Sequence, residues 1–544
     1  MFEDYNKTII ISTWGLPKNY REVYYVLEII TKNGGMDCVP RSKDIKKSSS
    51  TAAIKEILER KLNVKNIELL IFVQDTILLD EIRKNSSMYR GKDFSRKSLK
   101  DKLFVALYNS NITVARELGV NDPNAYRNIV RFVPGTLSYV EGLRLYTWRG
   151  KRIYDVLRGI LMLYIYSKLK ELGDPERIAI VLDTTHGINY FVLALKEATM
   201  LATELFVLDN IPKIKVLDIY HYNSDPITPD SREGKPSLKL HLLDKIRIIK
   251  DNKLYTSYIT SILRESEAIY GKNGALNNFW RGTNWVTILD TLSLYSKGLL
   301  VWSLRAVMDD YKIPAINQLE EAAESIKIKI RQQDSSMTIS YDWGARRPIV
   351  YIVVLSIFFE ILRKYANDAK VNIEIMKEAY KYISAILSSL SDIEEDRLNE
   401  IKQLITSIRE LLQAEDKFIC YDINEVINLA ERILMEPLRE INVHELKDRI
   451  LDYLKGCKVP RWKEILNCEG LKIYREAFDR AYLVINNDVS LLISLLCSSI
   501  ERRNIYAHAG LAYGLEWLAI NLKRSNKSLL CLRDVEHLKR IVKR

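Results

Sequence analysis

The 544-residue sequence has few cysteines and no long apolar run. Its six cysteines include no CxxC pair and are too sparse for a disulfide scaffold, so we expect free or buried thiols. The longest uncharged stretches, 348–359 and 489–500, are too short to cross a bilayer. The first residues lack the basic start and apolar core of a signal peptide. These absences predict a cytoplasmic protein without a membrane partner.

Common cofactor motifs are also missing. Neither GxxxxGK[ST] nor GxGxxG occurs, which argues against a Walker-type or dinucleotide site. His444-Glu445 begins like a zinc-binding HExxH motif, but Asp448 stands where the second histidine is needed, so we expect no metal. The composition, 47% apolar and 28% charged, is that of a globular protein of several domains. A net charge of +12 favours a polyanionic partner, nucleic acid ahead of a membrane surface.

The chain changes character along its length. Up to about residue 230, short β-branched runs alternate with helical patterns at 154–172 and 189–204, which is typical of a parallel sheet with covering helices. After the polar stretch 229–236, helical spacing dominates, for example at 316–331 and 371–413. The fold class predicted is α/β followed by all-α, in segments 1–230, 231–380 and 381–544. The predicted strands are Lys7–Ser12, Ile67–Val73, Asn128–Val133, Arg177–Leu182 and Ile214–Tyr220.

Polar residues follow the predicted strands, where ligands bind in such sheets. They include Thr13-Trp14-Gly15 and Gln74-Asp75-Thr76. The most informative is the sequence DTTHGIN at Asp183–Asn189, which brings hydroxyls, a histidine and a helix N-terminus together. This combination suits an anionic ligand such as a phosphate or nucleotide. An ordinary strand-to-helix turn, capped by Asp183 and Thr184, explains the same residues.

A second motif lies near the C-terminus, where Arg503-Asn504 is followed by His508. A histidine can move protons near neutral pH, and an arginine can stabilise the charge that grows on a phosphate in a transition state. The amide of Asn504 can orient either partner. Together they are the side chains that RNA cleavage without a metal requires. The alternative is a surface arginine and histidine that only form ion pairs.

Both motifs resemble those of one family. The signature DxTHGxN is filled at every fixed position, by Asp183, Thr185, His186, Gly187 and Asn189, and resembles that of the CARF domain (CRISPR-associated Rossmann fold). The R-N-x-x-x-H pattern resembles that of HEPN ribonucleases. The chain is therefore similar to the CARF-HEPN accessory ribonucleases of type III CRISPR systems, of Csx and Csm type. The resemblance implies a Rossmann-like CARF sensor at 1–230, a helical connector at 231–380 and a HEPN domain at 381–544.

The resemblance also implies an activity. A cyclic oligoadenylate, with tetra-adenylate as the expected ring, would activate cleavage of single-stranded RNA, with no metal or other cofactor. Cleavage would use the ribose 2′-OH, and Trp14 or Tyr190 could stack on adenine, with a core position as the alternative for Trp14. The catalytic residues implied are Arg503, Asn504 and His508. The messenger-binding residues implied are Thr13, Trp14, Gly15, Asp75, Thr184, Thr185, His186, Gly187 and Asn189.

Helical geometry adds a condition. On an ideal helix Arg503 and His508 lie about 140° apart, so one helix does not aim both at one phosphate easily. Two copies meeting across an axis can, which predicts a homodimer or a multiple of dimers. Two other functions fit the residues: a non-catalytic sensor that binds nucleic acid or a partner, and an enzyme that degrades the cyclic messenger. Basic clusters such as Arg96–Lys102 are expected to be solvated or to guide RNA.

Overall fold

In the computed structural model the chain forms two compact units. Unit 1 comprises 1–262, 273–283 and 313–357, and unit 2 comprises 263–272, 284–312 and 358–544. The residues that the structure describes are 2–15, 17, 20–31, 33–40, 44–89, 91–141, 144–149, 153–186, 189–211, 213–224, 237–250, 253–255, 258–270, 282–297, 299–309, 311–333, 336–342, 349–371, 419–434, 489–494, 517–522 and 527–532.

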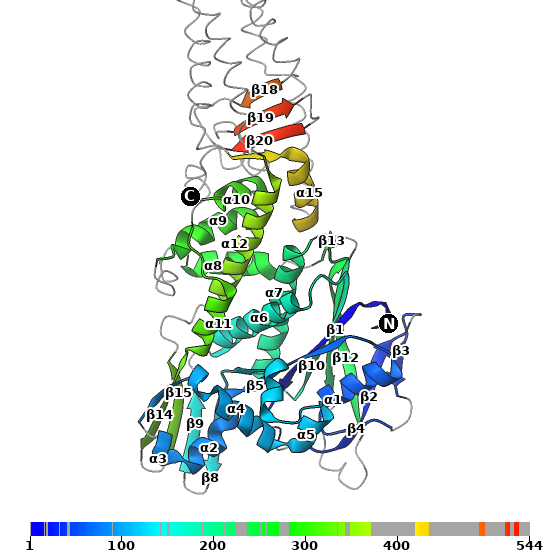
Figure 1. Ribbon diagram of the computed structural model, residues 1–544, viewed down its shortest axis with the longest axis vertical. Helices are drawn as coiled ribbons and strands as arrows, with labels where there is room; N and C mark the ends of the chain where they lie inside the picture. The colour runs from blue at the N-terminus through cyan, green and yellow to red at the C-terminus, as the bar shows by residue number, and fades with distance from the viewer. Residues whose placement is uncertain are drawn as a thin grey trace, which may run out of the picture. The chain divides into compact units, whose positions relative to one another are not determined.

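A large, mostly parallel sheet forms the centre of unit 1 (Figure 1). Its main path runs β3-β2-β12-β11-β10-β1-β5-β7, and the five strands from β11 to β7 are parallel. All five were predicted from the sequence. Their bounds are β1 Lys7–Trp14, β5 Ile67–Gln74, β7 Val130–Val133, β10 Arg177–His186 and β11 Val216–Ser224.

The central strands are buried on both faces, which explains their nearly continuous apolar sequences. From Thr8 onward β1 is buried, and β10 is buried from Ile178 to Thr184. Helices α6 (Ile153–Glu171) and α7 (Asn189–Asp209), both near their predicted positions, pack on each other and on strands of this sheet. Helix α1 (Ser50–Glu56) packs against β1, β2 and β10 (Figure 1).

The prediction that strand signals fade after residue 236 is wrong. Strand β12 (Ser237–Lys250) pairs with β11 and with β2 (Val23–Ile30), and so belongs to the same sheet. Charged residues alternate with apolar ones along β12, as a strand with one exposed face requires. The same charged residues are also compatible with an exposed helix, so the sequence alone does not indicate the strand. The edge of the sheet adds β3 (Met36–Val39) and β4 (Lys46–Lys47), and β13 (Lys253–Leu254) pairs with β12.

A second sheet in unit 1 has the order β6-β14-β15-β9-β8. The predicted helix 316–331 is helical only in α11 (Ile316–Glu324), after which β14 (Lys327–Gln333) begins. The period of two in KIKI favours a strand there, and the hairpin with β15 (Ser336–Asp342) satisfies it. The remaining strands are β6 (Asp93–Ser95), β8 (Leu137–Glu141) and β9 (Arg144–Arg149).

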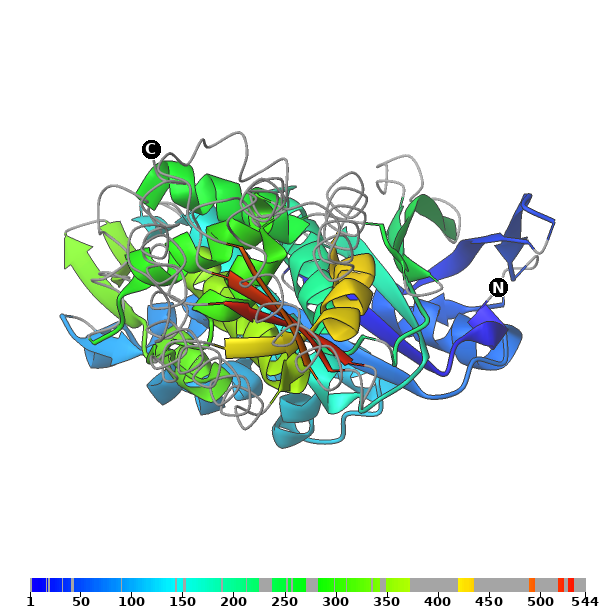
Figure 2. The same ribbon diagram turned by 90° about the horizontal axis from the view of Figure 1, so that it is seen from above.

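Unit 2 is not wholly helical, although the sequence predicted helices to the end. It holds a five-stranded antiparallel sheet of order β16-β17-β20-β19-β18, and α15 (Ile423–Ile433) packs on β17 and β20 (Figure 2). Residues 489–494 of an apolar run expected to be helical form β18, because a short apolar run fits either element. The other strands are β16 (Lys370–Val371), β17 (Ile419–Asp422), β19 (Trp517–Leu522) and β20 (Lys527–Leu532).

One cysteine corrects the expectation of thiols throughout. Cys420 in β17 is disulfide-bonded, and the residue opposite it in the ladder with β20 is Cys531. A disulfide at Cys420 cannot be deduced from cysteine spacing alone. The remaining helices of ten or more residues are α4 (Arg96–Ser110), α8 (Tyr258–Tyr270), α9 (Trp285–Ser296) and α12 (Ile349–Ala369). In the part of the chain that the structure describes, none of the helices is long and apolar enough to span a bilayer.

Candidate ligand-binding site at the carboxyl edge of the sheet

The order of the parallel strands creates a switch point between β1 and β10. After β1 and the edge strands β2 to β4, the chain passes through α1 to β5 and β7 on one side of β1, whereas β10 is followed by β11 on the opposite side. Crossover connections therefore diverge at the ends of β1 and β10, which is where open α/β sheets bind ligands. The two sequences predicted to bind a ligand, Thr13-Trp14-Gly15 and DTTHGIN, lie at these two ends, and Trp14 pairs in register with His186.

The carboxylate of Asp183 is the buried centre of this edge. Only 1% of the residue is exposed, yet its oxygens accept three hydrogen bonds. The hydroxyls of Ser50 and Thr51, at the start of α1, donate to Oδ2 over 2.7 and 3.0 Å. The backbone N–H of Thr185 donates to Oδ1 over 3.1 Å. Asp183 therefore caps the turn after β10 and ties it to α1.

Thr51 connects this carboxylate to the end of β1. Its hydroxyl has a single proton, which goes to Asp183, so Ser12 must donate the hydrogen bond of 2.7 Å between the two hydroxyls. The indole N–H of Trp14 also donates to Thr51, over 3.1 Å. Trp14 is fully buried, which is the position that the core alternative requires and leaves no open ring face for adenine in this conformation.

His186, at the end of β10, contacts both the segment that follows β1 and the start of α1. The N–H of Ser50 donates to its Nε2 over 3.2 Å, and the ring stacks on Tyr20 with centroids 4.1 Å apart. Burial lowers the pKa of His186, so the imidazole is neutral at physiological pH, and burial raises the pKa of the Tyr20 hydroxyl. A Cβ on Gly15 would stand 3.1 Å from the carbonyl oxygen of His186. A side chain there would press against the DTTHGIN turn.

Thr184 and the end of β11 are also joined. The Thr184 hydroxyl lies 3.0 Å from Nε2 of His221 and donates to the carbonyl of Tyr222 over 3.0 Å. Burial lowers the pKa of His221 to about 4. The hydroxyls of Thr13 and Thr185 are buried without a hydrogen-bond partner among the described residues. Such groups need a partner, and an incoming ligand can provide one.

Other predicted residues are placed differently or not described. Asp75 is fully buried and held by Arg96, so a messenger cannot reach it in this conformation. Asn189 begins α7, and Gly187 lies outside the described residues. Arg503, Asn504 and His508 also lie outside the residues that the structure describes. Among those that it does describe, no group of three or more His, Cys, Asp or Glu side chains could hold a metal ion.

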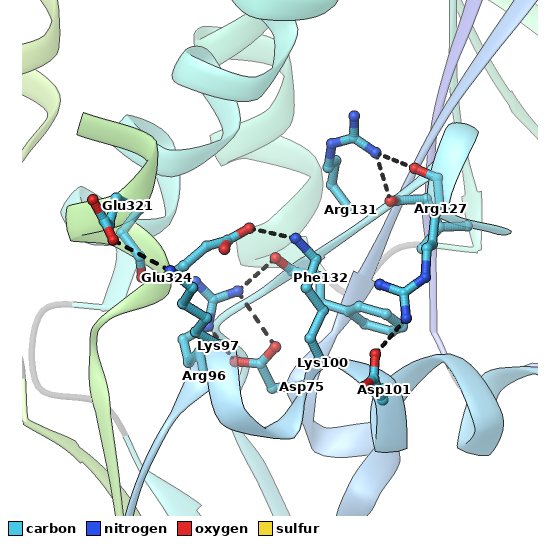
Figure 3. A network of polar contacts seen from close by, with 12 residues as sticks. Asp75, Arg96, Lys97, Lys100, Asp101, Arg127, Arg131, Phe132, Glu321 and Glu324 are labelled. Atoms are coloured by element: carbon cyan, nitrogen blue, oxygen red, sulfur yellow. Dashed lines mark hydrogen bonds and ion pairs between the residues drawn. The ribbon is translucent and has the colours of Figure 1, made fainter. Parts of the chain in front are cut away.

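Arg96 corrects the expectation of a solvated basic cluster. Only 4% of it is exposed, and its Nε donates to Asp75 Oδ2 over 2.7 Å (Figure 3). Two further hydrogen bonds reach the carbonyls of Ala323, over 3.0 Å, and Phe132, over 2.5 Å. Burial raises the pKa of Asp75, and the guanidinium opposes that rise. The neighbouring Lys97 and Lys100 pair with Glu321 and Glu324 of α11 at the surface.

A chain of hydroxyl contacts joins the first turn of α7 to the neighbouring strand ends. The hydroxyl of Tyr190 accepts from Nε2 of Gln74 over 2.8 Å and from the N–H of Thr136 over 3.0 Å. Gly135, the residue before Thr136, donates its N–H to the hydroxyl of Tyr341 in β15 over 2.9 Å. Tyr190 is therefore hydrogen-bonded to residues at the carboxyl ends of β5 and β7.

Sequence reasoning missed Ser50, Thr51 and Tyr20. A run of four hydroxyl residues, Ser48–Thr51, precedes the apolar residues of α1, which is the usual signal for a helix start. The capping role is real, since Ser49 accepts a hydrogen bond from Ala52 N–H. That signal says nothing of contacts with a strand far along the chain. Nothing in the local sequence of Tyr20 indicates its stacking on His186.

The first part of the chain matches a known family. Residues 9–226 match the family model described as CRISPR system endoribonuclease Csx1, CARF domain. The matched segment runs from β1 to the end of β11 and contains the whole switch-point site. A CARF domain implies cyclic oligoadenylate sensing in type III CRISPR defence, and the match supports a CARF-containing protein of the Csx1 type. None of the curated proteins matches the chain.

Proposed function

We propose that this protein is a cyclic-oligoadenylate-activated, metal-independent endoribonuclease of CRISPR antiviral defence that cleaves single-stranded RNA. The observation that carries the proposal is the position of DTTHGIN, at the switch point beside the end of β1. The family match over the same residues supports a cyclic oligoadenylate as the ligand. Tetra-adenylate is the ring we expect; like hexa-adenylate it contains a two-fold axis, which fits a site shared by two identical protomers.

The sensing site would offer the messenger hydrogen-bonding groups from both strand ends. Unpartnered hydroxyls of Thr13 and Thr185 and the neutral ring of His186 come from the described residues. The resemblance adds Gly187 and Asn189, and Asn189, the first residue of α7, would supply a backbone N–H, which favours phosphate at a helix N-terminus. Each protomer would bind half of the ring, so that the messenger favours one arrangement of the dimer over another.

The nuclease site in this proposal is a composite of two HEPN domains. The ribose 2′-OH attacks the adjacent phosphorus, the 5′-oxygen leaves, and the products are a 2′,3′-cyclic phosphate and a 5′-hydroxyl. His508 would move the protons, Arg503 would stabilise the charge on the phosphorane, and Asn504 would orient the reacting groups. Because the nucleophile belongs to the substrate, DNA would not be cleaved.

A fluorescent RNA cleavage assay in EDTA, with cyclic tri-, tetra- and hexa-adenylate added in turn, tests the proposal. We expect activity with one ring, and a loss of about 100-fold or more in His508→Ala. His444→Ala, a histidine with no assigned role, is the matched control and should cleave normally. Messenger binding without RNA cleavage would favour the non-catalytic sensor, and a linear product from labelled ring would favour messenger degradation. Wild-type cleavage rates in His508→Ala would refute the HEPN assignment.

A further inference from the structure

We propose that Ser50 and Thr51 are positioning residues of the messenger site. They hold the side chains of Asp183 and His186 in the orientation that ligand binding requires. The inference rests on the proposed function for the identity of the ligand. Its structural basis is independent: two adjacent residues of α1 contact Asp183 and His186 of the DTTHGIN turn. The sequence alone predicts neither Ser50 nor Thr51 at this site.

Asp183 depends on these hydroxyls because no cation compensates its charge. The carboxylate is 1% exposed, and no lysine or arginine among the described residues forms an ion pair with it. A buried carboxylate without a counter-ion needs hydrogen-bond donors around it. Two of its three donors are the hydroxyls of Ser50 and Thr51. Removing either one weakens the hold on the turn that carries Thr185 and His186.

His186 depends on the same segment through a different atom. The backbone N–H of Ser50 donates to Nε2, so in the neutral ring the proton must lie on Nδ1. Stacking on Tyr20 further limits the orientation of the ring. The fixed tautomer makes Nδ1–H a hydrogen-bond donor, which suits an acceptor such as a phosphate oxygen. Ser50 therefore sets the chemistry of His186 with its backbone and the position of Asp183 with its side chain.

Calorimetric binding of cyclic tetra-adenylate to the full chain tests the role of the hydroxyls. We expect about 10- to 100-fold weaker binding for Thr51→Val and about 10-fold weaker binding for Ser50→Ala, because hydrogen bonds to charged groups are strong. Thr51→Ser keeps the hydroxyl and should bind within about threefold of wild type. The matched controls are Thr199→Val and Ser356→Ala, buried hydroxyls that donate to carbonyls of their own helices. Wild-type affinity in Thr51→Val would overturn the proposal.

A proline at position 50 separates the backbone role from the side-chain role. Ser50 is the first residue of α1, where proline is well tolerated, and Ser49 has φ −131° and ψ 138°, which a following proline accepts. Ser50→Pro removes both the hydroxyl and the N–H, whereas Ser50→Ala removes only the hydroxyl. We expect NMR of histidine-labelled protein, assigned with His186→Gln, to show the Nδ1–H tautomer in wild type and Ser50→Ala, and a mixture in Ser50→Pro.

The binding and NMR measurements distinguish a failure of the proposed function from a failure of this inference. If wild-type protein binds none of the three rings, the proposed function is overturned, while the NMR comparison still decides whether Ser50 fixes the His186 ring. If the ring binds but Ser50→Pro and Ser50→Ala give the same His186 signals as wild type, the backbone role is wrong. Equal thermal unfolding of Thr51→Val and Thr199→Val would show that a difference in binding comes from the site and not from lost stability.

Discussion

Arg96→Met should destabilise unit 1 strongly, because it leaves Asp75 charged and without its cation. Methionine keeps much of the volume of the arginine stem but none of its donors. Asp75 is fully buried, and breaking a buried ion pair by removing one partner costs about 3–5 kcal/mol. The carbonyls of Ala323 and Phe132 also lose donors, at about 1 kcal/mol each. We expect the free energy of unfolding of unit 1 to fall by about 5–7 kcal/mol.

The effect should depend on pH in a defined direction. Burial raises the pKa of Asp75 in the folded protein above its ordinary value of 3.8, and loss of Arg96 would raise it further. For an acid of this kind the penalty is fully present above the folded pKa, shrinks as pH falls below it, and vanishes below the ordinary pKa of 3.8. Arg96→Met should therefore be much less stable than Asp75→Asn/Arg96→Met at pH 7, and the gap should shrink as the pH is lowered.

Urea unfolding followed by hydrogen exchange in peptides of unit 1 would measure this, because it reports that unit separately. The matched control is Arg127→Met, whose ion pair with Asp101 lies at the surface of the same region (Figure 3). Exposed pairs contribute about 0–1 kcal/mol. A loss in Arg96→Met no larger than in Arg127→Met, or a pH-independent gap to the double variant, would refute the reasoning.

Three further predictions concern buried polar groups and close packing. His221 has a folded pKa of about 4 against an ordinary 6.5, so folding should lose up to about 3 kcal/mol as pH falls from 6.5 to 4; His221→Gln should show a smaller fall in urea titrations at pH 7 and 4.5. Gly159→Ala should lower the free energy of unfolding by about 1–3 kcal/mol, because the new Cβ would stand 2.6 Å from the N of Val350, and an unchanged urea midpoint would contradict that contact. Tyr341→Phe should cost about 1–3 kcal/mol by stranding the N–H of Gly135, with faster exchange of that amide as the check.

The strands that were predicted correctly differ physically from those that were missed. Strands β1 and β10 lie between parallel neighbours and are buried on both faces, so their sequences are continuous apolar runs that can be recognised locally. Strands β12 and β14 carry alternating charges, which resemble those of an exposed helix. Which reading is correct depends on pairing partners far along the chain, and β2 lies more than two hundred residues before β12.

The same limit applies to the candidate site. The DTTHGIN motif is contiguous, so its place after a strand could be predicted from the sequence. Asp183 and Thr51 are 132 residues apart, and no local pattern indicates that their side chains meet. Arg96 belongs to a basic cluster that looks solvated, and its burial follows only from the position of Asp75 at the end of β5. Contacts of this kind are set by the topology of the sheet.

Tyr190 couples the DTTHGIN motif to the ends of β5 and β7 at the carboxyl edge of the sheet. Its hydroxyl accepts hydrogen bonds from Gln74, the last residue of β5, and from Thr136, which follows β7, while its backbone directly follows the DTTHGIN motif. Any displacement of the motif must either break both hydrogen bonds or carry the two neighbouring strand ends along. A ligand that displaced the DTTHGIN turn by the length of one hydrogen bond would therefore also displace the end of β7. That strand lies three strands away, at an edge of the sheet that the ligand does not contact.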